Sequence, residues 1–456
     1  MRNFTRATLA VAVMSVITPA VADQNATAEL EAVREEIRAL RQAYESRITE
    51  LEGKLEQLES RPRDTSAEAA SAVPARTPAP AGQHRRIYGN EFNPSIGVIL
   101  NGRWSSFSES GSEIAGFGVG EEGERGREGL AVDESELNVA ASIDDKFHGA
   151  MTAAIVREEG EDKIELEEAY VQTLGGAGLP AGLSLKAGRA FWTLGYLNEH
   201  HTHEDDFADR PLPSRVFLNN AFNDDGVEFS YVLPTALYSE IGGGVFRGDD
   251  LPFGDSTGSG PEAWSLYGRL GGDIGYNQSW RVGAYVLSGE AADRVTNEGD
   301  VGFAGDTDLY VADLRYTWAP TGNARQRELT LQGEYFRRSE DGSYRDATAG
   351  TGNVAVDDAV NGGYVQAVYK FRPQWRIGAR YSLLQAPDVP AGLVGSALDG
   401  GGHDPEAYAL MLDWTNSEFS RVRLQYNREE PAQGLKDDQF ILQYIMSLGA
   451  HGAHKY

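Results

Sequence analysis

Residues 438–450 read DQFILQYIMSLGA, and this stretch decides the fold. Successive side chains of a β-strand point to opposite faces, and Gln443 and Ser447 fall on one face of this one. The opposite face carries only apolar side chains, those of Phe440, Leu442, Tyr444, Met446, Leu448 and Ala450. The chain then ends on an aromatic residue, Tyr456. An amphipathic strand followed by a terminal aromatic residue is typical of the last strand of a membrane barrel, so we expect the apolar face to contact lipid.

The same period-two alternation extends backwards along the chain to about Pro94. It predicts sixteen strands, at 95–107, 130–143, 147–157, 164–174, 183–194, 226–232, 238–247, 264–272, 280–290, 308–318, 328–338, 363–371, 375–384, 406–414, 421–428 and 438–450. Most of them are close to the 9–11 residues that a tilted membrane-crossing strand requires. We therefore predict an all-β fold, a 16-stranded antiparallel transmembrane β-barrel over residues 94–456.

The connections between these strands alternate in length. Most of those after odd-numbered strands are long, at 108–129, 195–225, 248–263, 291–307, 339–362 and 385–405, and two are shorter, at 158–163 and 429–437. Those after even-numbered strands are short, such as 144–146 and 372–374. Long loops at one end and tight turns at the other are the signature of outer-membrane barrels, and an even strand count places both chain ends at the periplasmic, tight-turn end.

Tryptophan placement gives an independent indication of a membrane rim. Trp280 and Trp375 open predicted strands just after short turns, and Trp318 and Trp414 close strands just before them. Membrane barrels carry aromatic girdles at the level of the lipid headgroups. A soluble β-sandwich or propeller, the alternative all-β fold, gives no reason for this clustering.

Three segments precede the predicted barrel. Residues 1–22 have two arginines, an apolar run over 7–18 and the small residues Ala20-Val21-Ala22, the pattern of a cleaved signal peptide. Residues 23–60 contain a heptad-like apolar seam with one stutter, which predicts a periplasmic coiled coil; a helix packed on its own barrel is the alternative. Residues 61–93 are rich in Pro and Ala and predict a semi-rigid linker.

The composition limits the possible partners. The chain has 41 basic against 69 acidic residues, a formal net charge of −28, which repels nucleic acid and attracts cations; acidic charge that only solubilises the loops is the alternative. Cysteine is absent, so the chain has no disulfides and no thiolate metal site. We expect partners to be outer-membrane lipid and small solutes or ions, and no nucleic acid.

Several short motifs follow one another in an order that resembles the phosphate-selective porin family, the porin O and P type. They are Gly188-Arg189 with Phe191 and Gly195, then Asp209-Arg210-Pro211-Leu212-Pro213, then Asp225-Gly226-Val227. The stretches 198–203, 206–209 and 447–454 are most similar to the zinc-regulated, TonB-associated outer-membrane proteins of that group. The resemblance implies a homotrimer of sixteen-stranded barrels whose third loop, here 195–225, folds into the lumen and narrows the pore.

This third loop contains a cluster of histidine and acidic residues. The candidate metal ligands are His200, His201, His203, Glu204, Asp205, Asp206 and Asp209. Imidazole and carboxylate together suit Zn²⁺, Ni²⁺ or Cu²⁺, and in a strand-like backbone His201 and His203 would point the same way. A water-facing polar loop is an equally weighted alternative. The string 201–205 also resembles the start of the hydrolase pattern H-x-H-x-D-H, but Asp206 replaces the last histidine, and we predict no catalytic residues and no enzyme.

Charged residues alternate with apolar ones on several predicted strands and are expected to face the lumen. They are Arg189, Arg281, Arg315, Arg376 and Arg380, with Glu134, Glu136, Glu165, Glu167 and Glu334. Opposed charges across a lumen create a transverse field that orders water and sizes solutes; pairs that merely keep the wall neutral and rigid are the alternative.

The sequence therefore predicts a porin-like channel of the outer membrane. We expect it to pass small hydrophilic solutes, with a preference for cations because the loops are acidic, and to require no cofactor. The alternative is an outer-membrane receptor without a plug domain whose third loop binds Zn²⁺ for metal uptake.

Overall fold

The computed structural model describes residues 94–449, apart from 112, 159–160, 255–257 and 418. The predicted signal peptide, coiled coil and linker, and the histidines at 451 and 454, lie outside the described residues. Within the described part of the chain, the helices are short, and none has the length and hydropathy needed to cross a membrane.

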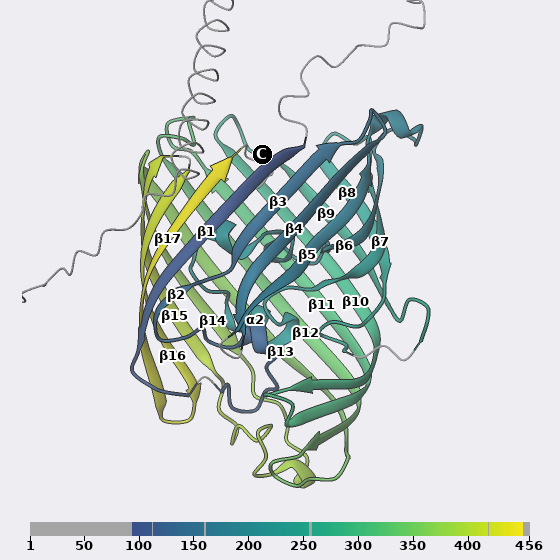
Figure 1. Ribbon diagram of the computed structural model, residues 1–456, viewed down its shortest axis with the longest axis vertical. Helices are drawn as coiled ribbons and strands as arrows, with labels where there is room; N and C mark the ends of the chain where they lie inside the picture. The colour runs from purple at the N-terminus through teal and green to yellow at the C-terminus, as the bar shows by residue number, and fades with distance from the viewer. Residues whose placement is uncertain (1–93, 112, 159–160, 255–257, 418, 450–456) are drawn as a thin grey trace, which may run out of the picture. The chain divides into compact units, whose positions relative to one another are not determined.

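Seventeen strand segments form one closed antiparallel sheet (Figure 1). They are β1 Ser95–Phe107, β2 Gly129–Val132, β3 Ser135–Ser142, β4 Phe147–Glu158, β5 Glu161–Thr173, β6 Leu183–Phe191, β7 Asn223–Val232, β8 Tyr238–Phe246, β9 Ala263–Asp273, β10 Gln278–Thr296, β11 Val301–Trp318, β12 Glu328–Asp346, β13 Val354–Arg372, β14 Trp375–Leu384, β15 Glu406–Ser417, β16 Ser420–Ala432 and β17 Leu435–Gly449. Because β2 and β3 both pair with β1 and are separated only by Asp133 and Glu134, they make one interrupted strand. The wall therefore has sixteen strands, as predicted.

The first and last strands close the barrel. β1 pairs with β17 from Gly97↔Gly449 to Phe107↔Gln439. On β17, Phe440, Leu442 and Tyr444 are about half exposed, while Ile441 and Ile445 are buried. Alternate apolar residues on the other strands are exposed in the same way, so the outer surface carries the apolar face that was predicted for contact with lipid.

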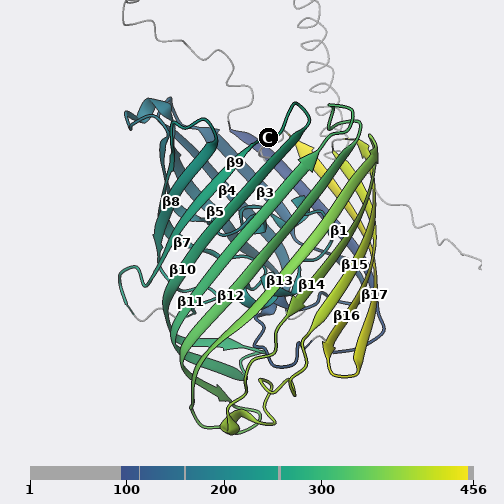
Figure 2. The ribbon, with the colours of Figure 1, turned by 180° about the vertical axis from the view of Figure 1, so that it is seen from behind.

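Four strands are longer than their sequence pattern predicts. β10 to β13 each contain 18 or 19 residues, and Figure 2 shows them side by side in the wall. The loops predicted at 291–307 and 339–362 are therefore mostly strand, with turns only at 297–300 and 347–353. This end of the barrel is called the long-loop end below, and the end that holds the tryptophan pair Trp375 and Trp414 the short-turn end.

The wall is incompletely paired around the β4–β5 hairpin. β3 pairs with β4 only as far as Ser135↔Ile155, and β5 pairs with β6 only between Ala169↔Arg189 and Gln172↔Lys186. Toward the long-loop end, the described backbone ladder of the hairpin therefore joins β4 and β5 only to each other. Its outward side chains there are apolar: Ile164 is 78% and Leu166 48% exposed.

Candidate functional site: a loop across the lumen

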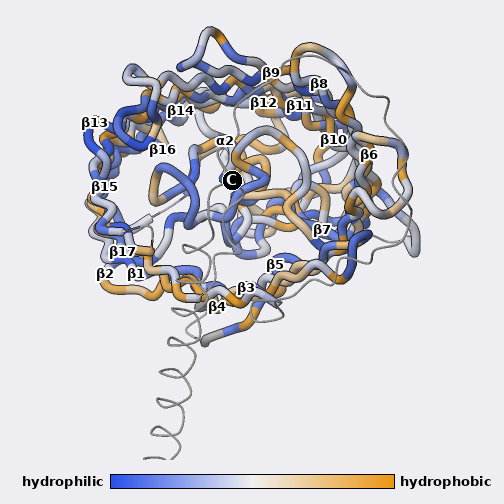
Figure 3. Tube along the Cα trace, turned by 90° about the horizontal axis from the view of Figure 1, so that it is seen from above, coloured by the Kyte–Doolittle hydropathy of each residue, from blue (hydrophilic) through white to orange (hydrophobic). Residues whose placement is uncertain are grey.

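The segment between β6 and β7, residues 192–222, folds into the barrel and is called the lumen loop here (Figure 3). It contains two 3-10 turns, η4 Leu197–Glu199 and η5 Thr202–Glu204, and one short helix, α2 Leu212–Leu218. Pro211 precedes α2 as its N-cap, and Asn219 ends the helix in the left-handed conformation. The loop thus occupies the lumen, which agrees with the expectation for the segment 195–225.

One side of the lumen loop is apolar and packs on the inner wall. Trp192, Phe217 and Phe222 are each 1% exposed and belong to the same buried cluster as Leu309 and Phe336 of the wall. Burial of large aromatic side chains supplies most of the stabilisation in such a contact. The sequence pattern gave no indication of this cluster, because the lumen faces of membrane barrels are ordinarily polar.

Polar contacts fix the entry and exit of the loop. The side-chain amide of Asn198, 2% exposed, donates to the carbonyl oxygens of Trp192 and Phe222, and its oxygen accepts from the Phe222 backbone N–H at 2.6 Å. Glu334 of β12 accepts from the backbone N–H groups of Tyr196 and Leu197. Gly195 has φ +77°, and a Cβ there would stand 2.4 Å from the Glu334 carboxylate. The turn into the lumen therefore needs glycine at 195.

Arginines of the wall bind the acidic part of the loop. Arg376 lies 2.6 Å from Asp206, and Arg380 lies 2.9 Å from Asp209. Burial would raise the pKa of Asp206, but neighbouring arginines, Arg376 first, lower it, so this carboxylate remains ionised. These aspartates, predicted as metal ligands, therefore serve as anchors to the wall formed by β14.

Asp205, another predicted ligand, binds an arginine of the lumen loop itself. Its carboxylate accepts from Arg210 Nε at 3.0 Å. Arg210 is 4% exposed and also donates to the backbone carbonyl oxygens of Leu197, His200 and Asn220. A planar guanidinium with five donors suits this bracing role, which holds separate turns of the loop together.

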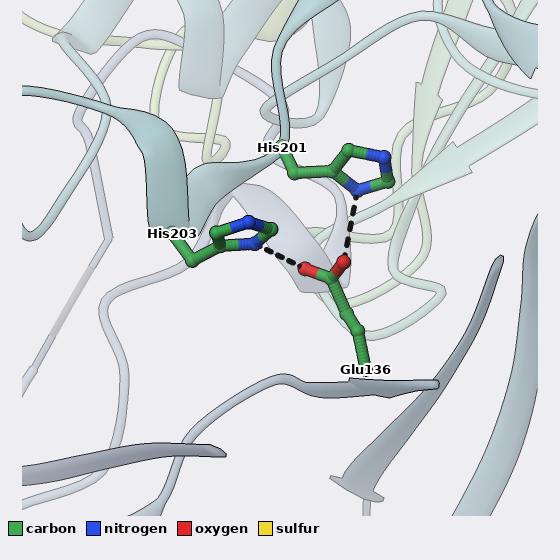
Figure 4. A group of neighbouring side chains, drawn as sticks. All are labelled: Glu136, His201 and His203. Atoms are coloured by element: carbon green, nitrogen blue, oxygen red, sulfur yellow. Dashed lines mark hydrogen bonds and ion pairs between the residues drawn. The ribbon is translucent and has the colours of Figure 1, made fainter. Parts of the chain in front are cut away.

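Two of the predicted ligands, His201 and His203, lie together against the opposite wall (Figure 4). Their rings stack with centroids 5.6 Å apart. The carboxylate of Glu136 on β3 lies between them, 2.6 Å from His203 Nδ1 and 3.4 Å from His201 Nδ1. Nitrogen and oxygen atoms of these three residues lie within 4.8 Å of one another, which is close enough to hold one metal ion.

A β-bulge on β5 adds two further carboxylates. The β4–β5 register shifts between Thr152 and Ala153, which leaves Glu167 as the extra residue. A bulge re-aims side chains, and here consecutive residues reach the same histidine. Glu167 lies 3.3 Å from His201 Nδ1, and Glu168 lies 3.1 Å from His201 Nε2. Glu136 and Glu167 alternate with apolar residues in the sequence, which predicts that they face the lumen but does not predict a role in the metal site.

These carboxylates control the protonation of His201. Burial alone would lower the pKa of His201, but the surrounding carboxylates, Glu136 first, raise it well above the ordinary histidine value. The imidazolium then pairs with its acidic neighbours when no metal ion is bound.

The remaining candidates lie apart from this group. His200 stacks on Tyr196 and makes a 2.8 Å contact from Nδ1 to the Tyr196 carbonyl oxygen. Glu204 is in η5, and the grouped ligand atoms do not include it. Of the seven predicted ligands, therefore, the structure brings only His201 and His203 into one group.

The predicted lumen arginines also contact the loop. The guanidinium groups of Arg281 and Arg315 lie 4.8 and 4.4 Å from the ring centre of Tyr196. Cation–π contacts of this kind hold the first turn of the loop to β10 and β11.

Beside the loop lies a cavity of about 1530 Å³. It is bounded by residues 121–134 and by the polar side of the lumen loop, including Thr202 and Asp209. Twelve carboxylate residues line it against six arginines. The cavity is larger than an ordinary ligand pocket and carries excess negative charge.

Comparison with known proteins supports the fold and leaves the family open. No family model matches the chain. An uncharacterized protein of Aquifex aeolicus (strain VF5) is 28% identical over 396 residues, 80% of each chain. OprB of Pseudomonas putida is similar in structure, with a TM-score of 0.50 at 11% identity over 78% of this chain and 94% of that one. The outer membrane channel DcaP of Acinetobacter baumannii gives 0.47 at 13% identity over 77% and 96%. The likeness to OprB supports a porin-like barrel. It gives no support for membership of the phosphate-selective porin family or of its zinc-regulated group.

Proposed function

We propose that this protein is an outer-membrane channel for small hydrophilic solutes and that it prefers cations. The observation that carries the proposal is the acidic cavity beside the lumen loop. A confined, low-dielectric path lined by an excess of one charge raises the local concentration of the opposite ion. The porin-like fold favours this channel over the receptor alternative, and the short-turn end is then periplasmic.

Planar-bilayer recording tests the proposal directly. The purified full-length chain is expected to give discrete conductance steps, and under a KCl gradient its reversal potential is expected to have the sign of K⁺ preference. Absence of conductance would reject the channel, and a reversal potential of the opposite sign would reject the cation preference alone.

Neutralising the rim of the cavity should weaken this preference. Glu121, Glu124 and Glu128 line the cavity, and their joint replacement by glutamine is expected to lower the K⁺/Cl⁻ permeability ratio about two- to threefold at 0.1 M salt. Asp273→Asn, at an exposed carboxylate beside a short turn, is the control and should leave the ratio unchanged. An unchanged ratio in the triple variant would place selectivity elsewhere.

We further propose that the chain forms a homotrimer and that the β4–β5 hairpin contributes to its interface. In lipid, every backbone polar group needs a partner, so strand edges without one are not stable against hydrocarbon. The hairpin has such edges next to exposed Ile164 and Leu166, and a second copy of the chain would cover both the edges and the apolar surface.

Native mass spectrometry in detergent measures this assembly. The wild type is expected at three times the chain mass, and the double variant Ile164→Lys/Leu166→Lys as monomer, because lysines buried between subunits would be unpaired. Val365→Lys places a charge at a 62% exposed position on the outer face of β13; it is the control and should stay trimeric. A monomeric wild type would overturn the proposal.

A further inference from the structure

We propose that the group formed by His201, His203, Glu136 and Glu167 binds one divalent transition-metal ion and that this ion clamps the lumen loop to the β3–β5 wall. The proposal does not depend on the channel function. It rests on three features of the group: the spacing of its atoms, the satisfaction of its hydrogen bonds, and its charge.

The first feature is spacing. Ligand atoms about 2.0–2.1 Å from a tetrahedral Zn²⁺ ion stand about 3.3–3.4 Å from each other. His201 Nδ1 lies 3.4 Å from Glu136 Oε2 and 3.3 Å from Glu167 Oε2. The His203 Nδ1–Glu136 Oε1 separation of 2.6 Å is a hydrogen-bond length and needs to open by less than 1 Å. Three of the four ligand positions are therefore almost in place.

The second feature is a pair of buried polar atoms that face each other at ion-pair distance without the geometry of a hydrogen bond. These are His201 Nδ1 and Glu167 Oε2, which face each other. The Glu167 side chain is 10% exposed and that of His201 12%. Buried polar atoms are ordinarily satisfied, and the exceptions point to an absent water or ion. A metal ion between these two atoms and Glu136 would replace this poorly aligned contact by direct coordination.

The other ring nitrogen of His201 already has the partner that a metal ligand requires. Glu168 lies 3.1 Å from Nε2, which orients the ring and leaves Nδ1 directed at Glu136 and Glu167. Carboxylate–histidine–metal relays of this form recur at zinc sites, where the outer carboxylate fixes the tautomer. We therefore assign Glu168 a positioning role.

The third feature is charge. Oxygen atoms of Glu134, Glu136 and Glu167 lie within 4.8 Å of one another, and Glu168 is adjacent in sequence. Carboxylates this close together repel one another unless a proton or a cation lies between them. Concentrated negative charge at buried positions is unfavourable unless it is compensated, and a divalent cation compensates it. Because imidazole is present with the carboxylates, Zn²⁺, Ni²⁺ and Cu²⁺ fit better than Mg²⁺ or Ca²⁺.

The clamp follows from where the ligands originate. His201 and His203 belong to the lumen loop, whereas Glu136 and Glu167 belong to β3 and β5. One bound ion would cross-link the loop to this wall, opposite the Arg376–Asp206 and Arg380–Asp209 contacts. The ion would also remove negative charge from the edge of the acidic cavity, which includes Glu134 and Glu167.

Calorimetric titration of EDTA-treated, full-length protein with ZnCl₂ tests the site. Wild type is expected to bind one more equivalent than His201→Ala/His203→Ala. His200→Ala, which alters the adjacent histidine, should bind like wild type. Glu167→Gln preserves shape and should weaken binding, and Glu168→Gln should weaken it about 10–100-fold through the positioning of His201. MgCl₂ should not compete.

Equal stoichiometry and affinity in wild type, the double histidine variant and Glu167→Gln would overturn the site. The glutamine variant keeps this test valid if the histidine variant does not fold. X-ray absorption of the zinc-loaded wild type should show two histidine ligands among light-atom donors, and a spectrum without histidine scattering would also reject the site. If the protein conducts ions but fails these tests, only the proposed metal site is rejected. If it binds zinc but does not conduct, only the proposed channel function is rejected.

Discussion

Removing the lumen loop is expected to raise single-channel conductance about two- to fourfold, because the loop fills much of the cross-section through which ions pass. Trp192 and Phe222 lie directly beyond the last β6–β7 pair, Phe191↔Asn223, and the Trp192 backbone N–H donates to the Phe222 carbonyl oxygen at 3.5 Å. Residues 194–220 can therefore be replaced by an Asn-Gly turn that closes the β6–β7 hairpin. Bilayer recordings at the same KCl concentration compare the two proteins.

A second, smaller deletion controls for loop shortening itself. Removing residues 348–352 trims the tip of the β12–β13 hairpin and leaves the lumen loop intact, so conductance should not change. A gentler variant, Asp206→Ala/Asp209→Ala, cuts the contacts to Arg376 and Arg380 and is expected to give a smaller increase with noisier open-channel current. If the 194–220 deletion folds and conducts like wild type, the loop does not narrow the pore.

The barrel could be predicted from the sequence because lipid imposes a simple rule on it. The outer face must be apolar at every second residue, and the predicted strands 95–107 and 375–384 coincide with β1 and β14. The rule applies only to the part of the wall that contacts lipid. β10 to β13 extend further, through polar pairs such as Asp306↔Asp341 and Glu340↔Asp358, and these positions show no alternation of apolar residues.

The site was predictable only in part. Histidines two residues apart were expected to share a side in an extended backbone, and their rings do stack, although His203 lies within the 3-10 turn η5 and His201 precedes it. Their carboxylate partners come from β3 and β5, far away in sequence, and depend on pairing register. The bulge that brings Glu167 and Glu168 to His201 has no signature in the hydrophobic pattern.

The acidic residues of the loop were assigned as ligands because sequence proximity was the only available guide. In the structure, Asp206 and Asp209 face arginines of β14, and Asp205 binds Arg210 of the loop itself. A buried carboxylate takes the nearest cation that geometry offers, and here the wall supplies guanidinium groups. The alternation of Arg376 and Arg380 with apolar residues predicts that they face the lumen, but their pairing with the loop depends on how the loop crosses the lumen.

Replacing Asp413 is expected to destabilise the barrel far more than replacing a surface carboxylate. Asp413 is fully buried on β15, where its carboxylate binds Arg423 Nε at 2.8 Å and also binds Arg376. Arg423 is itself 1% exposed and donates to the backbone carbonyl oxygen of Asp205 at 2.8 Å. Asp413→Ala leaves the buried Arg423 and the 21% exposed Arg376 without this counter-ion. Breaking a buried pair such as Asp413–Arg423 costs about 3–5 kcal/mol.

Guanidinium titration of the chain refolded in lipid vesicles, followed by tryptophan fluorescence, measures the loss. Asp438→Ala is the control, since its partner Arg428 is 44% exposed and Asp438 36%, and such a surface pair contributes at most about 1 kcal/mol. Asp413→Asn should fall between them, because the amide still accepts a hydrogen bond but carries no charge. Equal midpoints for Asp413→Ala and Asp438→Ala would mean that water compensates the two arginines. Arg376 and Arg423 contact both Asp413 and the lumen loop, so Asp413→Ala should also make the loop more mobile. Open-channel noise should then rise in Asp413→Ala and not in Asp438→Ala. Such a difference would connect the stability of the wall to the control of the pore.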